Sequence, residues 1–115
     1  MLSAYITHAD CLKHEMGPDH PECPERIHAI ADMLLVKGYR GFMLPYDAPL
    51  ASEEQLGRAH SAAYVRTLQD CAPTEGYARL DPDTVMNPHT LQAALRSAGA
   101  AVLATDLVLQ GEVST

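Results

Sequence analysis

The sequence is rich in helical patterns and poor in strands, and this imbalance limits the folds open to the chain. Only Ser3–Thr7 and Phe42–Pro45 fit short strands. One or two short strands cannot form a stable sheet with two faces to cover, yet the predicted helices carry apolar faces that must pack on something. The helices therefore either pack on each other or cover a sheet that the chain does not itself contain. The four predicted helices span residues 24–37, 52–59, 61–70 and 87–110.

Local end signals define the first three helices. Pro24 suits a first helical position, because its missing N–H has no helical partner there, and Gly38 supplies a stop. Ser52 and Gln55 match a capping box, in which each side chain satisfies a free backbone donor of the other residue. Ser61 can cap the next helix.

The fourth predicted helix is the longest. Asn87-Pro88 pairs a good N-cap with a good first residue, and Gly111 ends the helix. The small residues of Ala98–Ala101 leave room for another element to pack closely against the helix backbone. Its apolar stripe consists of Leu91, Leu95, Ala98, Val102 and Leu109.

Composition excludes several classes of protein. The 115 residues are 47% hydrophobic and 20% charged, which is an ordinary globular balance. A net charge of −7 argues against a nucleic-acid partner, because phosphate binding needs a basic surface. The N-terminus has no signal peptide pattern, and the apolar stretch 97–109 is too short to span a membrane. The three cysteines, irregularly spaced, indicate reduced thiols and a cytoplasmic protein.

Two predicted loops hold the candidate chemistry. The first, residues 8–23, carries possible metal ligands, but their spacing matches no known zinc pattern, and we favour a polar loop over a metal site. The second, residues 71–83, ends in Asp81-Pro82-Asp83, whose carboxylates can bind a cation, hold a substrate amide or brace a turn. His60-Ser61 does not indicate a hydrolase, since Ser61 has a simpler role as a cap. The possible ligands of the first loop are His8, Asp10, Cys11, His14, His20 and Cys23.

Four segments together resemble the histone deacetylase superfamily, closest to the class II enzymes and the bacterial acetylpolyamine amidohydrolases. Gly17–Ile27 (G-P-D-H-P-E-C-P-E-R-I) is similar to the family's first active-site loop and first helix. Arg58–Val65 (R-A-H-S-A-A-Y-V) resembles its H-S-x-x-Y-V helix start. Leu80–Pro88 (L-D-P-D-T-V-M-N-P) is similar to its second active-site loop, and Ala94–Val102 to the helix that follows.

The resemblance implies the N-terminal segment of an arginase/deacetylase-type α/β fold, in which helices surround a central parallel sheet. Family members use Zn²⁺ to polarise an acetamide carbonyl and activate water. Their zinc ligands and catalytic histidines follow a Gly-His-His motif that this sequence lacks. We therefore expect no catalytic, metal-binding or cofactor-binding residue in this chain.

The resemblance also implies roles at the edge of the substrate site. Asp81 or Asp83 is the aspartate of the rim that holds the substrate backbone, and the two stay open as alternatives. His20, Pro21 and Glu22 shape one wall of the substrate tunnel. Arg26 lies beside the internal cavity below the metal, although from chemistry alone it is a surface or loop-bracing arginine.

Two functions remain as hypotheses. In the first, residues 1–115 form a single, incomplete domain of a zinc-dependent deacetylase, inactive alone, whose complete family acts on acetyl-lysine or small acetylated amines. In the second, the chain is a non-catalytic binding or oligomerisation module derived from that fold. The second hypothesis predicts self-association through the apolar surface that faces the sheet, and an incomplete domain can also dimerise to hide that surface.

Overall fold

The computed structural model describes residues 2–115 and confirms a helix-rich α/β fold. Two 3-10 turns, η1 (Ala9–Leu12) and η2 (Tyr39–Phe42), follow the first strand and the first helix. The remaining elements in chain order are β1 (Ser3–Thr7), α1 (Glu25–Val36), β2 (Met43–Asp47), α2 (Glu53–Gly57), α3 (Ala62–Cys71), β3 (Ala78–Asp81), β4 (Thr84–Met86) and α4 (Thr90–Leu109).

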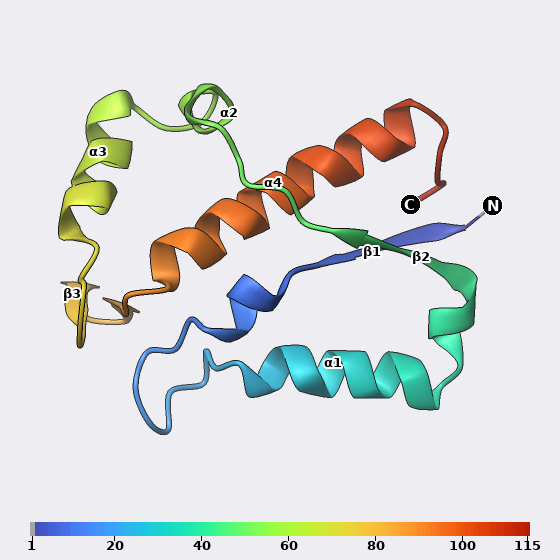
Figure 1. Ribbon diagram of the computed structural model, residues 1–115, viewed down its shortest axis with the longest axis horizontal. Helices are drawn as coiled ribbons and strands as arrows, with labels where there is room; N and C mark the ends of the chain where they lie inside the picture. Colours follow the sequence, from blue (N-terminus) through green and yellow to red (C-terminus); the bar gives the residue numbers. More distant parts are fainter. Residues whose placement is uncertain (1) are drawn as a thin grey trace.

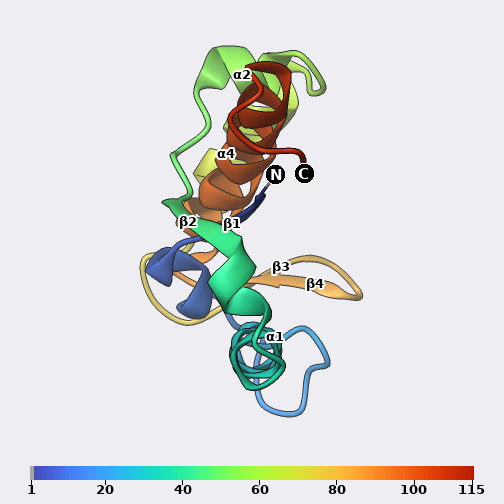
Figure 2. The ribbon, with the colours of Figure 1, turned by 90° about the vertical axis from the view of Figure 1, so that its right-hand side faces the viewer.

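A narrow parallel sheet lies between two long helices. Strands β1 and β2 pair in parallel, with Ser3 opposite Met43 and Thr7 opposite Asp47. Helix α4 lies on one side of this pair and α1 on the other (Figures 1 and 2). The two predicted strands therefore exist and pair, and the helices cover a sheet that is only two strands wide.

The local signals for helix ends are largely confirmed. Ser52 and Gln55 form the complete capping box at α2. The Ser61 hydroxyl accepts a hydrogen bond from the backbone N–H of Tyr64 at the start of α3, so this serine is a cap. Gly38 follows α1 with φ 75°, a left-handed conformation that glycine adopts at low cost.

Two predictions for the second half of the chain are wrong in detail. The predicted loop 71–83 contains β3, which pairs with β4 as an antiparallel hairpin, and these two strands were not predicted. Helix α4 begins at Thr90 and not at Asn87-Pro88. Asn87 instead accepts the backbone N–H of His89 with its side chain, so the Asn-Pro signal forms a turn ahead of the helix.

The best-buried residues surround α4. Gly99 of this helix is buried, and the segment 49–51 passes directly over it, with the Ala51 N–H donating to the Leu95 carbonyl. The prediction of a close approach at the small residues is thus confirmed. The prediction that Leu109 belongs to the apolar stripe of this helix is wrong. Leu109 is 80% exposed, and Leu107 is buried instead. The buried apolar residues are Ala48, Ala51, Met86, Ala93, Leu107 and Val113.

Candidate functional site

The first loop is fastened to the β3–β4 hairpin and to the start of α4. The Asn87 side-chain amide donates to the Lys13 carbonyl at 2.9 Å, and Asn87 is buried. His14 Nδ1 lies 2.7 Å from the Thr90 hydroxyl. The Tyr77 hydroxyl donates to Glu15 at 2.6 Å. Hydrogen bonds therefore tie residues 13–15 of the first loop to side chains that lie more than 60 residues later in the sequence.

Asp81 and Asp83, between which the sequence left the rim role open, have different surroundings in the hairpin turn. Asp81 Oδ1 accepts the backbone N–H of Asp83 at 2.8 Å. This bond, together with the Thr84 hydroxyl, holds the pKa of Asp81 below its ordinary value. The Asp83 side chain is 96% exposed, and its recorded contact is with His20. Asp81 thus braces the turn, whereas Asp83 presents its carboxylate outward.

His20 joins the first loop to the hairpin turn. Its Nδ1 accepts the backbone N–H of Glu22 at 3.0 Å, and its Nε2 lies 3.5 Å from Asp83 Oδ1. Because Nδ1 acts as the acceptor, the neutral ring carries its proton on Nε2, which then points at Asp83. Pro21 is exposed beside these residues. The predicted tunnel wall and the predicted rim aspartate therefore lie side by side, although their roles stay predictions.

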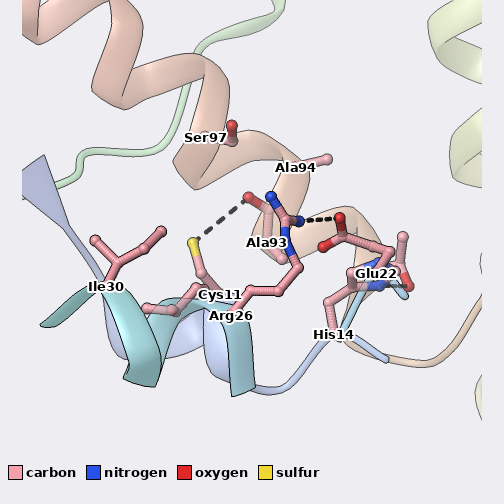
Figure 3. Close-up of a pocket in the computed structure, with 10 residues that line it drawn as sticks. Cys11, His14, Glu22, Arg26, Ile30, Ala93, Ala94 and Ser97 are labelled. Carbon is pink, nitrogen blue, oxygen red and sulfur yellow. Dashed lines mark hydrogen bonds and ion pairs between the residues drawn. The ribbon is translucent and has the colours of Figure 1, made fainter. Parts of the chain in front are cut away.

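Arg26 lines a cavity of about 340 Å³ between α1 and α4 (Figure 3). Its guanidinium pairs with the Glu22 carboxylate one turn back along the chain, and both side chains are about half exposed. Cys11 and Ala93 line the same cavity, with Cys11 Sγ 3.9 Å from the Ala93 carbonyl oxygen. Burial raises the pKa of the Cys11 thiol, so this cysteine is a poor nucleophile. Arg26 thus braces Glu22 and also faces a cavity.

The possible metal ligands of the first loop do not converge. His8 accepts the Asp10 N–H, while His14 and His20 bind the partners described above. A zinc site needs three or four converging donors, and no group of three such side chains comes together within residues 2–115. Among the described residues 2–115, the side chains of the first loop therefore do not fit a zinc ion, and no step of zinc chemistry is assigned to them.

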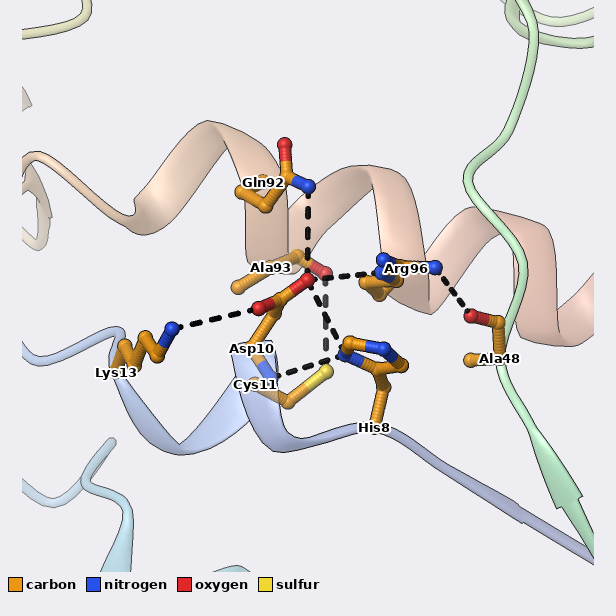
Figure 4. A network of polar contacts seen from close by, with 8 residues as sticks. All are labelled: His8, Asp10, Cys11, Lys13, Ala48, Gln92, Ala93 and Arg96. Atoms are coloured by element: carbon orange, nitrogen blue, oxygen red, sulfur yellow. Dashed lines mark hydrogen bonds and ion pairs between the residues drawn. The ribbon is translucent and has the colours of Figure 1, made fainter.

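An ion-pair network at the ends of β1 and β2 was missed by the sequence analysis (Figure 4). Arg96 of α4 donates from Nε to Asp10 at 2.9 Å and from a terminal nitrogen to the Ala48 carbonyl at 2.9 Å. Gln92 and Lys13 approach the same carboxylate at 3.5 and 3.6 Å. The Arg96 hydrogen bond is the main cause of a lowered pKa at Asp10. Arg96 thereby fixes both strand ends to α4.

We expect Tyr77→Phe to raise the pKa of the Glu15 carboxyl. That pKa lies below its ordinary value chiefly because the Tyr77 hydroxyl donates to the carboxylate, with the Gly17 N–H second. Removing the hydroxyl removes the larger contribution and returns the pKa toward the value of a free glutamate. An NMR pH titration of the Glu15 carboxyl carbon measures the change. Tyr39→Phe, at another exposed tyrosine, is the control; an equal shift in both variants would contradict the assignment.

The comparison with protein families decides the ancestry of the chain. Residues 20–115 match the family model described as "Histone deacetylase domain". The chain belongs to the histone deacetylase family. The predicted resemblance is therefore confirmed, and with it the reading of this chain as part of such a domain.

Two relatives share about one third of their aligned residues with this chain. A histone deacetylase-like amidohydrolase of Pseudomonas aeruginosa is 34% identical over 89% of this chain, and the polyamine deacetylase HDAC10 of Mus musculus is 33% identical over 98%. The crystal structure of the HDA15 HD domain superposes with a TM-score of 0.84 at 26% identity over 97% of this chain.

The deacetylase-family match covers only part of each relative. The chain spans 31% of the Pseudomonas protein, 18% of mouse HDAC10 and 33% of the HDA15 HD domain. Within residues 2–115, no helix is both long enough and apolar enough to cross a membrane.

Proposed function

We propose that this chain forms the substrate-entrance wall of a zinc-dependent deacetylase or amidohydrolase domain. The supporting observation is the contact between His20 and Asp83, which brings the two loops together at one rim. The names of the relatives favour an acetylated amine as substrate, either acetyl-lysine or an acetylpolyamine. By itself the chain holds the entrance and performs no hydrolysis.

Asp83 is the residue of this rim that binds the substrate backbone. Its carboxylate is exposed, whereas Asp81 is engaged by the backbone of its own turn. An exposed carboxylate can accept an N–H hydrogen bond from the substrate, and a hydrogen bond to a charged group contributes about 1.5–3 kcal/mol. His20 orients the carboxylate from the side.

The rim role is tested in a chimera in which this chain replaces the matching region of the Pseudomonas amidohydrolase. We expect Asp83→Asn to lower kcat/KM for an acetyl-lysine peptide by about ten- to a hundredfold without changing the zinc content. Glu54→Gln, at an exposed carboxylate of α2, is the matched control and should leave kcat/KM unchanged. An Asp83→Asn chimera with full kcat/KM would refute the role of Asp83.

The isolated chain provides a second test of the proposal. With zinc added, we expect no turnover of acetyl-lysine or acetylpolyamine substrates. Metal-dependent turnover by the pure 115-residue protein would contradict the proposal.

The exposed apolar side chains of α1 support a second candidate function, a non-catalytic binding or oligomerisation module. None of the α1 residues is buried, and Ile30 and Met33 are each more than half exposed. This reading expects a discrete oligomer of the isolated chain by light scattering, whereas a monomer with a cooperative melt would count against it. The free thiols of Cys11, Cys23 and Cys71 support a cytoplasmic location in either case.

A further inference from the structure

Another cavity lies between α1 and the β1–β2 pair, with a volume of about 340 Å³. The turns η1 and η2 both contribute to its lining, and they lie at opposite ends of β1 (Figure 1). It shares only Ile27 with the cavity beside Arg26, and neither His20 nor Asp83 lines it. It is therefore separate from the proposed substrate rim.

The ring of Tyr5 holds Arg40 at the wall of this cavity. The guanidinium carbon of Arg40 lies over the ring, 4.3 Å from its centre. This distance is well inside the range of a cation–π contact, which fixes the guanidinium without using a hydrogen-bond acceptor. The N–H donors of a stacked guanidinium lie in its own plane and remain available to another partner.

The Arg40 guanidinium has no carboxylate partner among residues 2–115. None of the ion pairs formed by these residues includes Arg40, although Asp47 lines the same cavity. Arg40 is partly buried, so its charge is less well solvated than that of a fully exposed arginine. A guanidinium in this setting binds a planar anion through two parallel N–H···O hydrogen bonds.

The rest of the lining favours a singly charged anion with an apolar body. Leu12, Ile27 and Ala31 supply apolar surface. Arg40 is the single lysine or arginine of the lining, and Asp47 adds a negative charge. A phosphate dianion would therefore be repelled by Asp47 more strongly than a carboxylate, with no second fixed cation to offset the repulsion.

Two histidines of the lining do not change this preference. His8 Nδ1 lies 3.1 Å from a carboxylate oxygen of Asp10. His28 lies one helical turn after Glu25 on α1. A positive charge on either ring would thus have a carboxylate close by in the chain itself.

We propose that the cavity between α1 and the β1–β2 pair binds an aliphatic monocarboxylate. The carboxylate accepts two hydrogen bonds from the Arg40 guanidinium, and the hydrocarbon chain lies against Leu12, Ile27 and Ala31. Tyr5 acts as a positioning residue, because it holds the guanidinium in place. The site does not depend on the function proposed for the rim.

The test titrates the isotope-labelled chain with hexanoate and follows its NMR spectrum. We expect the Arg40 Nε–H signal and the amides of Ile27 and Ala31 to shift and to saturate in the millimolar range. Hexanol has the same hydrocarbon chain without the charge, and inorganic phosphate has charge without the chain. Each should bind at least about tenfold more weakly than hexanoate.

Arg40→Gln should weaken hexanoate binding by about tenfold or more, because it removes the charge-assisted hydrogen bonds. Arg58→Gln, at an exposed arginine that does not line the cavity, is the matched control and should bind hexanoate like the parent chain.

A second variant leaves Arg40 and Tyr5 in place. Ala31→Leu fills the apolar part of the cavity and keeps a good helix former in α1, so it should weaken hexanoate binding to a similar extent. The proposal is overturned if hexanoate does not saturate the signals of these residues, or if hexanol or phosphate binds as tightly. It is also overturned if either variant has a folded amide spectrum and binds hexanoate as tightly as the parent chain.

Discussion

Gly99→Ala is expected to destabilise the fold by about 2–3 kcal/mol, although alanine is the better helix former. A Cβ at position 99 would lie 1.9 Å from the Pro49 carbonyl oxygen and 2.7 Å from its carbonyl carbon. These are backbone atoms, and the Ala51–Leu95 hydrogen bond holds their segment against α4. The chain must therefore move away from the helix. The helix propensity of alanine, worth about 1 kcal/mol, offsets only part of this cost.

Gly57→Ala is the matched control for this prediction. Gly57 is also a helical glycine, the last residue of α2, but a Cβ added there would meet no atom within 4 Å. We expect this variant to keep its stability or to gain up to about 1 kcal/mol. Urea titrations followed by circular dichroism compare both variants with the parent chain. Equal midpoints for Gly99→Ala and the parent would show that the segment 49–51 does not press on α4.

Features set by neighbouring residues could be predicted from the sequence. The capping box of Ser52 and the cap of Ser61 involve partners three residues away, so the pattern contains the whole interaction. The start of α4 was wrong because the side-chain oxygen of Asn87, a good cap in isolation, accepts the His89 N–H and the Thr90 hydroxyl in a turn ahead of the helix. The β3–β4 hairpin was missed because its strands are only four and three residues long.

The candidate site depends on contacts between distant residues, and sequence patterns do not contain these. The resemblance marked His20 and Asp83 separately, but only the fold places them 3.5 Å apart. The proposal of Asp83 over Asp81 as the rim aspartate rests on the hydrogen bond within the turn, which the sequence does not show. Arg96 had no signal at all, since its carboxylate partner lies 86 residues earlier in the chain. Asp10 was considered only as a possible metal ligand.

Arg96→Met is expected to lower the melting temperature by several degrees. The methionine keeps most of the aliphatic volume but loses the hydrogen bonds to Asp10 and to the Ala48 carbonyl. Both acceptors are then left without their strongest donor, and the ends of β1 and β2 are no longer fixed to α4. Arg58→Met removes an exposed arginine whose carboxylate partner is 3.9 Å away, and such a pair contributes little. If Arg58→Met lowered the melting temperature as much as Arg96→Met, the stabilising role of the Arg96 hydrogen bonds would be contradicted.

The pH dependence of stability tests the same network through the lowered pKa of Asp10. A carboxyl whose pKa is lower in the folded state stabilises the fold above its unfolded pKa, about 3.9 for aspartate. This contribution is lost as the pH falls from there through the folded pKa. Because Arg96 is the main cause of the lowered pKa, Arg96→Met should lose less stability than the parent between pH 5 and pH 2, roughly the range in which aspartates titrate. Parallel loss of stability in the two proteins over that range would mean that Arg96 does not hold the Asp10 carboxylate in solution.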